Sequence, residues 1–440
     1  MRLAWFSPMP PVRSGVAQCS AELVDELRSD WTIDVFVDTP SADGDLRSAH
    51  EFVWQHQQNP YDLPVYQLGN SSHHDYIWPY LFRFPGLVVL HDAHLHHARA
   101  ALLLRERRPS DYRAEFAAAQ PGVNPDAAEL AVAGFDSHLL YQWPFTSLAV
   151  QVSRMTAVHG RITRDELSAR YPSRAIEHVR LGHGIRLSNE EASASQERAR
   201  ARLGIPADAI VFGCFGSLTP DKRVPQVLDA FEAVLPYIPS ARLLLAGPHA
   251  AHYDVNADVA RRSIAGRVHL TGFVAADADL SAYIAAADIT LNLRWPTARE
   301  TSGPWLRSLA AGKPSIVIDL AHTADVPTLD PRTWRGSVAG SEAVAVAVDI
   351  LDEDHSLRLA MRRLGQDAAL RDSLGSAARS YWTREHSQAA MFTDYRRIVP
   401  LAAATEAPRP ALPSHLRDDE SGVMNDILET FGVPVPWSKI

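Results

Sequence analysis

The chain has 440 residues, 46% of them hydrophobic and 22% charged, and its 43 basic and 52 acidic side chains give a net charge of −9. That length exceeds one ordinary hydrophobic core and predicts two domains. The acidic balance argues against a broad nucleic-acid-binding surface, two cysteines make no disulfide framework, and no apolar run approaches the roughly 18 residues of a membrane span. The N-terminus has no long apolar core before Pro8, so we expect no secretion signal and a cytoplasmic protein.

The first elements follow a strand–loop–helix–strand order. The pattern predicts them over residues 2–7, 8–15, 16–28 and 31–38. This order is typical of a doubly wound α/β unit, in which ligands bind at the carboxyl ends of the strands. Gly15 therefore lies in a loop on the expected functional side, with an ordinary tight turn as the alternative interpretation.

Two further strands, predicted at 65–68 and 86–90, are each followed by polar residues. These are Asn70, His73, His91 and Asp92, with His94, His96 and His97 close behind. Neutral imidazole is a common metal ligand, which suggests zinc. No cysteine is nearby, however, and a polar loop at a strand end accommodates histidines equally well, so we expect no metal.

A basic helix is predicted over residues 95–108, where four arginines accompany three consecutive leucines. A solvated helix face is the favoured interpretation over a membrane-docking one. Residues 109–134 are acidic, rich in alanine and weakly periodic, and they suggest a mobile helical insertion.

The second half repeats the β/α alternation, and its first strand is followed by a glycine-containing loop. Strands are predicted at 210–215, 241–247, 268–273 and from 289. The loop runs from Gly216 and Ser217 to Lys222 and Arg223, directly before a helix at 224–235. A loop of this kind that brings a lysine to a helix start favours phosphate binding, although an exposed basic pair is the alternative.

Residues 288–319 carry the clearest chemical pattern. After the strand and a loop, Glu300 precedes a predicted helix start with a hydroxyl cap at Ser302 and a proline in the first turn. A helix N-terminus favours anions. A carboxylate beside an anion site suits a ligand that carries both hydroxyls and phosphates, such as a nucleotide-sugar. The alternative is that Glu300 only complements the helix dipole.

The sequence RWPTARETSGPWLRSLAAGKPSIV, starting at Arg294, resembles the donor-binding segment of glycosyltransferase family 4. The resemblance implies a GT-B fold: two Rossmann-like doubly wound domains facing an interdomain cleft, with a C-terminal helix crossing back to the first. It also implies a retaining, hexosyltransferase-type enzyme that needs no metal or other cofactor. Such an enzyme moves a sugar from a nucleoside diphosphate sugar to a glycan, lipid-linked or small-molecule acceptor.

The family's Glu-x7-Glu pattern is only half present. Glu300 matches the glutamate that meets the transferred sugar, whereas Ser308 stands where the ribose-binding glutamate is expected. Lys222 matches the second of two basic residues that grip the diphosphate. Ser217 stands at the first, so that either Arg223 or the Ser217 hydroxyl would replace the missing charge.

The resemblance assigns roles residue by residue. Catalytic roles fall to Glu300, Lys222 and His91. Donor binding falls to Gly15, Gly216, Ser217, Lys222, Arg223, Gly247, Phe273, Arg294, Glu300, Thr301, Ser302, Gly303 and Ser308. The acceptor side is formed by Asn70, His73, His91 and Asp92. Some members dock on membranes through the N-terminal domain, which would place this chain at the inner membrane face; no nucleic-acid partner is expected.

The expected organisation is an acceptor domain over residues 1–187, a donor domain over 188–385 and a crossover helix over 386–400. Residues 401–440 are expected to be a disordered, dispensable tail with a short helix from Met424 to Phe431. Two other functions stay open. One is another GT-B enzyme such as a sugar-nucleotide epimerase, and the other is a non-catalytic nucleotide-sugar-binding relative, which Ser217 and Ser308 would favour.

Overall fold

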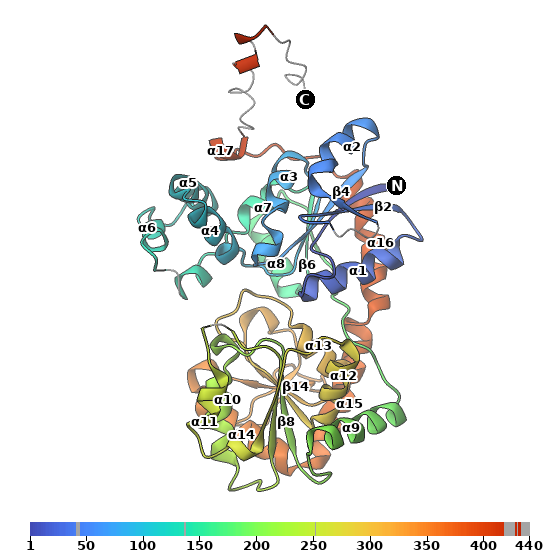
Figure 1. Ribbon diagram of the computed structural model, residues 1–440, viewed down its shortest axis with the longest axis vertical. Helices are drawn as coiled ribbons and strands as arrows, with labels where there is room; N and C mark the ends of the chain where they lie inside the picture. The colour runs from blue at the N-terminus through green and yellow to red at the C-terminus, as the bar shows by residue number, and fades with distance from the viewer. Residues whose placement is uncertain (41–44, 136–137, 251, 418–426, 429, 433–440) are drawn as a thin grey trace. The chain divides into compact units, whose positions relative to one another are not determined.

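The structure is a computed structural model, and it describes residues 1–40, 45–135, 138–250, 252–417, 427–428 and 430–432 (Figure 1). The chain forms two compact units. The first comprises Met1–Val158, Ser168–Glu177 and the chain from Arg396 onward, and the second comprises His159–Leu167 and His178–Tyr395. Residues 178–187, expected in the first domain, thus belong to the second unit, and the return to the first unit falls inside helix α16 (Gln388–Ala404).

The first unit is built on a parallel sheet of seven strands in the order β3-β2-β1-β4-β5-β6-β7. The strands are β1 (Arg2–Phe6), β2 (Thr32–Val37), β3 (Leu46–Ser48), β4 (Leu63–Leu68), β5 (Leu87–Leu90), β6 (Met155–Val158) and β7 (Ile176–His178). The chain proceeds from β1 to β2 and β3 on one side and from β4 to β7 on the other. The order therefore reverses between β1 and β4, and ligands of such sheets bind where it reverses.

The first unit also contains helices, several of which bury one face. They are α1 (Gly15–Leu27), α2 (Phe52–Gln58), α3 (Ile77–Arg83), α4 (His96–Arg105), α5 (Pro109–Ala119), α6 (Ala127–Val132), α7 (Ser147–Val152), part of α8 (Arg161–Arg170), the end of α16, and α17 (Ser414–Arg417). The prediction for α1 is confirmed: Ser14 caps it by accepting a hydrogen bond from the Ala17 amide, and Leu23, Val24 and Leu27 are buried.

The segment after α4 corrects the expectation of a mobile insertion. Helices α5 and α6 share a core with α4, in which Tyr112, Phe116 and Phe145 are buried. The basic helix is not simply a solvated face either, because Arg99 is buried and forms a two-point ion pair with Glu115. The sequence pattern did not predict this packing, because each helix contributes only a few residues to a core that several helices share.

The C-terminal segment also differs from the expected disordered tail. Helix α16 continues to Ala404, and His415 in α17 lies with Nε2 3.0 Å from Oε1 of the buried Glu115. The short helix expected from Met424 to Phe431 falls mostly outside the described residues. Within the described part of this segment, residues up to Ala404 and His415 therefore have defined contacts.

The second unit has a parallel sheet of seven strands in the order β10-β9-β8-β11-β12-β14-β13. The strands are β8 (Val211–Phe215), β9 (Arg242–Ala246), β10 (Val268–Gly272), β11 (Ile289–Asn292), β12 (Ser315–Ile318), β13 (Thr328–Leu329) and β14 (Ala345–Val348). Strands β8 and β11 are neighbours, with Ile289 opposite Phe212. The strand order reverses at this pair, so the loops after β8 and β11 meet at the switch point.

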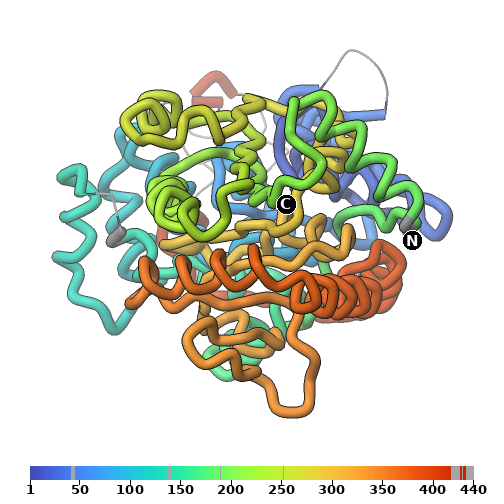
Figure 2. Tube along the Cα trace, turned by 90° about the horizontal axis from the view of Figure 1, so that it is seen from below, coloured from blue at the N-terminus to red at the C-terminus, as the bar shows by residue number. Residues whose placement is uncertain are grey.

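Helices cover both faces of the second sheet (Figure 1). They are α9 (Asn189–Leu203), α10 (Val224–Val234), α11 (Val255–Ala260), α12 (Asp277–Ala286), α13 (Gly303–Ala310), α14 (Glu353–Gln366) and α15 (Ala368–Glu385). One core includes residues of α10 and α14, and a second core on the other face includes residues of α9 and α12. Figure 2 traces α14, α15 and α16 as successive helices in orange to red. Every helix in the described part of the chain is too short or too polar to cross a membrane.

Candidate functional site

The loop after β8 is shaped by two glycines. Gly216 has φ +88° and Gly247, after β9, has φ +153°, both of which favour glycine. A Cβ on Gly247 would overlap the carbonyl group of Gly216, and the Gly216 amide donates to the Ala246 carbonyl at 2.9 Å. Gly247 is buried. The sequence predicts that Gly247 contacts the donor. In the structure Gly247 instead packs against the Gly216 loop.

Lys222 folds back over this loop from a short 3₁₀ turn, Pro220–Lys222. Its Nζ donates to the Phe215 carbonyl at 3.3 Å and would lie 2.5 Å from a Cβ on Gly216. Burial, and next the charge of Arg294, lower the pKa of Lys222 to about 8. The absence of a side chain at Gly216 thus leaves room for the Lys222 ammonium, whose charged form is disfavoured by burial and by Arg294.

Glu300 lies on the loop after β11 and is held by two side chains. Its Oε1 is 2.7 Å from Nε of Arg294, and its Oε2 accepts from the Thr297 hydroxyl at 2.9 Å. The loop is fastened to the loop after β8, because the Trp295 amide donates to the Asp221 carbonyl at 2.7 Å. Next to Glu300, Arg299 has φ +58° and pairs with Glu166.

Helix α13 begins beside the same loops. The Ser302 hydroxyl accepts from the Trp305 amide at 3.4 Å, as the sequence predicted, and Pro304 follows in the first turn. A Cβ on Gly216 would lie 3.4 Å from Cγ of Pro304, which places the helix start against the glycine loop. The second unit therefore gathers Lys222, Glu300 and a helix N-terminus at its switch point. Thr301 and Gly303 lie at that helix start and are half-buried.

Other predicted donor residues have different surroundings. Ser308 exposes none of its surface and donates to the Pro304 carbonyl at 2.8 Å. Arg223 forms a two-point ion pair with Glu353 of α14. Ser217 is exposed. The Ser308 hydroxyl and the Arg223 guanidinium thus already have partners within the protein. The structure therefore does not support a ribose contact by Ser308 or a phosphate contact by Arg223.

Phe273 follows β10, which lies at the edge of the sheet two strands from β8. Its side chain is 44% exposed. An exposed aromatic ring at the carboxyl end of a strand can stack on a base.

In the first unit, polar residues gather on the loops after β4 and β5, beside the switch point between β1 and β4. His91 Nε2 donates to the Gln67 side-chain oxygen at 2.8 Å, and His74 Nδ1 donates to the Gln67 carbonyl at 2.9 Å. Asp92 accepts from the Asn70 amide at 2.6 Å. These contacts join the loops after β4 and β5.

Asn70 also caps a helix from a distance, since its side chain accepts from the Ala98 amide near the start of α4 at 2.9 Å. His73 is exposed. Gly15 begins α1, and a Cβ there would have no atom of the protein within 4 Å. The protein itself therefore does not require glycine at position 15.

The histidine cluster is dispersed. His96 shares a hydrogen bond of 3.0 Å with the Tyr112 hydroxyl and stacks on Phe145, and burial lowers its pKa to about 3. Among the described residues no group of three or more histidine, cysteine, aspartate or glutamate side chains is placed to hold a metal ion.

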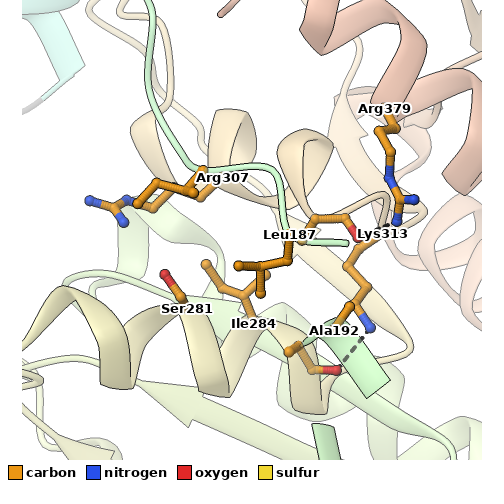
Figure 3. Close-up of a pocket in the computed structure, with 10 residues that line it drawn as sticks. Leu187, Ala192, Ser281, Ile284, Arg307, Lys313 and Arg379 are labelled. Carbon is orange, nitrogen blue, oxygen red and sulfur yellow. Dashed lines mark hydrogen bonds between the residues drawn. The ribbon is translucent and has the colours of Figure 1, made fainter. Parts of the chain in front are cut away.

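A cavity of about 30 Å³ lies elsewhere on the second unit, lined by residues of α9, α12, α13 and the segment before α9 (Figure 3). Lys313 in its wall donates to the Ala285 carbonyl at 2.8 Å, and Arg307 donates to His183 and pairs with Asp277. In Figure 3 the Arg307 side chain points away from Lys313. Because the cations do not converge and the volume suits one or two waters, this cavity is not a second nucleotide site.

Sequence reasoning missed Gln67, Asp221, Thr297 and Glu166. Gln67 lies inside an otherwise apolar strand, and a buried amide there is the signal that could have revealed it. Asp221 and Thr297 flank predicted residues on loops, where spacing alone does not indicate which side chains turn inward.

The two Rossmann-like domains with parallel sheets define the class: the chain has the GT-B fold of glycosyltransferase structures. The expected fold is confirmed. Within it, residues 195–328 match the family model described as "Glycosyl transferases group 1". The match covers the glycine loop, Lys222 and Glu300. A search of curated protein sequences finds no match.

Several solved structures share the fold over nearly the whole chain. Sucrose-phosphate synthase from Thermosynechococcus elongatus aligns with a TM-score of 0.63 at 15% identity, covering 92% of this chain and 100% of that one. Anabaena Alr3699/HepE in complex with UDP and glucose gives 0.59 at 14% identity, covering 91% and 100%. WaaG, a glycosyltransferase involved in lipopolysaccharide biosynthesis, gives 0.58 at 13% identity, again covering 91% and 100%. At these identities the likeness shows the fold.

Proposed function

We propose that this chain is a retaining glycosyltransferase of family 4 that moves a hexosyl group from a nucleoside diphosphate sugar to an acceptor. The observation that carries the proposal is the grouping of Lys222, Glu300 and the start of α13 at the switch point of the second sheet. The family model matches the same segment, and one solved structure of this fold is a complex with UDP and glucose.

The chemical task is to stabilise a departing diphosphate and a sugar that develops positive charge. Lys222 and the amides at the start of α13 would take the phosphate charge. The Glu300 carboxylate would accept hydrogen bonds from sugar hydroxyls and face the developing positive charge. Preorganised groups of this kind lower the barrier because they need not reorient during the reaction.

In the first unit, we propose that the acceptor side uses Asn70, His73, His91 and Asp92. Nε2 of His91 lies 2.8 Å from the Gln67 side-chain oxygen, and this contact holds the ring in one orientation. A histidine held in this way would orient an acceptor hydroxyl. Gly15, whose Cβ position is open, would let the amides at the start of α1 approach the donor phosphates.

No metal takes part in this proposal, because the cationic groups are supplied by the chain. An excess of EDTA should therefore leave the initial rate unchanged within about twofold. Full loss of activity on chelation, restored by adding a divalent cation, would contradict the metal-independent mechanism.

A second candidate is a non-catalytic relative that binds the same donor. The burial of Ser308 favours it, since a serine hydroxyl with no exposed surface does not contact a ribose. The test is a panel of UDP-, GDP- and ADP-sugars, screened first by thermal shift and then for release of nucleoside diphosphate. Saturation at about a hundred times the dissociation constant stabilises the chain by about 2.7 kcal/mol, which a melting curve resolves. In this assay water takes the sugar in place of the acceptor, so release of nucleoside diphosphate supports the transferase, and binding without release supports the second candidate.

A further inference from the structure

Arg294 lies between two carboxylates of the candidate site. Its Nε is 2.7 Å from Oε1 of Glu300, and its Nη1 is 3.5 Å from Oδ2 of Asp221. Since Asp221 directly precedes Lys222, the guanidinium bridges the phosphate-side loop and the sugar-side loop. Its side chain is 36% exposed, so this bridge is accessible to a ligand.

Among charged groups, Arg294 also has the largest effect on the pKa of Lys222. After burial, the charge of Arg294 is the largest cause of the lowered pKa of Lys222. Arg223 is adjacent in sequence but is committed to Glu353 through two contacts and lies at φ +59° at the start of α10. Of these two arginines, Arg294 is the one whose partners belong to the site.

We propose that Arg294 serves both halves of the donor: it positions the carboxylate of Glu300 for the sugar and adds a second positive charge for the diphosphate. This inference rests on the proposed function. A guanidinium suits the double role because it is planar, stays charged and presents several N–H groups in a fixed fork. A lysine at this position would keep the charge but could not hold Glu300 in the same geometry.

The experiment compares Arg294→Lys and Arg294→Gln with wild type. UDP, GDP and ADP are titrated by calorimetry, and nucleoside diphosphate release from the best donor is followed against donor concentration. Arg294→Lys should bind the nucleotide within about threefold of wild type yet lose tenfold or more in kcat. Arg294→Gln should lose tenfold or more in both. Retention of kcat in Arg294→Lys would overturn the positioning role, and full nucleotide affinity in Arg294→Gln would overturn the charge role.

Arg332 provides a matched control, because it also lies between two carboxylates, Asp330 and Asp349, but between β13 and β14. Arg332→Lys should leave affinity and kcat unchanged. A purely structural role for Arg294 would lower the melting temperature of its variants while kcat per folded molecule stayed constant.

A double variant separates positioning from general damage. If Arg294 acts on turnover through Glu300, then Arg294→Lys should reduce the rate of Glu300→Gln by less than about threefold. An undiminished tenfold loss in that background would overturn the inference. A wild-type chain that neither binds the three nucleotides nor releases them from their sugars would instead overturn the proposed function, and this inference with it.

Discussion

The loops beside the two switch points of this molecule are joined by different kinds of contact. In the second unit the loops are joined by charges: Arg294 bridges Asp221 and Glu300 beside Lys222. In the first unit the loops are joined by hydrogen bonds: His91 pairs with the Gln67 side chain, and Asp92 accepts from the Asn70 amide. The strand order is the same around the two reversals and differs only in the last two strands. The shared order therefore brings polar loops together at the same place in each unit, while the side chains decide which part of a substrate they suit.

Replacing Glu300 should have the largest effect on turnover of all the substitutions in the second unit. We expect Glu300→Ala to lower turnover by about a hundred- to a thousandfold, because one preorganised electrostatic contact has that typical effect. Glu300→Gln should lose less, since it keeps one acceptor oxygen. Nucleoside diphosphate binding should change little. Initial rates against donor concentration measure this, with folding checked by circular dichroism, and normal turnover in both variants would reduce Glu300 to a helix-capping role.

Lys222→Ala should have the next largest effect. A hydrogen bond between charged groups contributes about 1.5–3 kcal/mol, or roughly ten- to a hundredfold in affinity. The loss should fall on both nucleotide binding and turnover, because the contact strengthens as the diphosphate leaves. Calorimetry with the nucleotide and steady-state rates check it, and unaltered turnover would show that this loop does not face the phosphates.

The pH dependence of nucleotide binding sharpens the contrast between the loops of the second unit and those of the first. Because Lys222 in the folded chain has a pKa of about 8, against 10.5 ordinarily, the ammonium is lost as the pH rises through 8. Affinity should be flat near pH 7 and fall above pH 8 toward tenfold per pH unit. The same depressed pKa means that the unfolded chain binds more protons between pH 8 and 10.5, so the free energy of unfolding should rise across that interval.

Lys313 supplies the control for this titration, because burial also lowers its pKa to about 8 but it lies at the separate cavity. Lys313→Met should keep the pH profile of nucleotide binding, whereas Lys222→Met should flatten it. Titrations from pH 7 to 9.5 distinguish the two lysines, and a profile that persists in Lys222→Met would assign the ionisation to another group.

The smallest predicted effect concerns the first unit and is structural. A chain ending at Ala404 loses the contact of His415 with the buried Glu115 and should melt several degrees lower, because removing such a contact costs about 1.5–3 kcal/mol. A chain ending at Arg417 is the control, and His415→Ala should reproduce most of the loss. Equal melting temperatures for the two shortened chains would show that residues 405–417 are dispensable.

The sequence by itself determined the features that depend on near neighbours. It predicted the β/α alternation, the Ser302 cap of α13 and the loop that brings Lys222 to a helix start, because periodicity, turns and caps are local. The resemblance carried by residues 294–317 added the GT-B fold, which one motif of that length can specify.

Only the tertiary structure decided how the side chains are paired. Arg223 and Glu353 are separated by 130 residues, and His415 and Glu115 by 300. Nothing in the local pattern indicates that Arg223 is used by the fold or that Arg294 bridges two loops of the site. The physical reason is that a charge chooses its partner by distance in the folded chain, and parallel sheets bring together loops that are far apart in sequence.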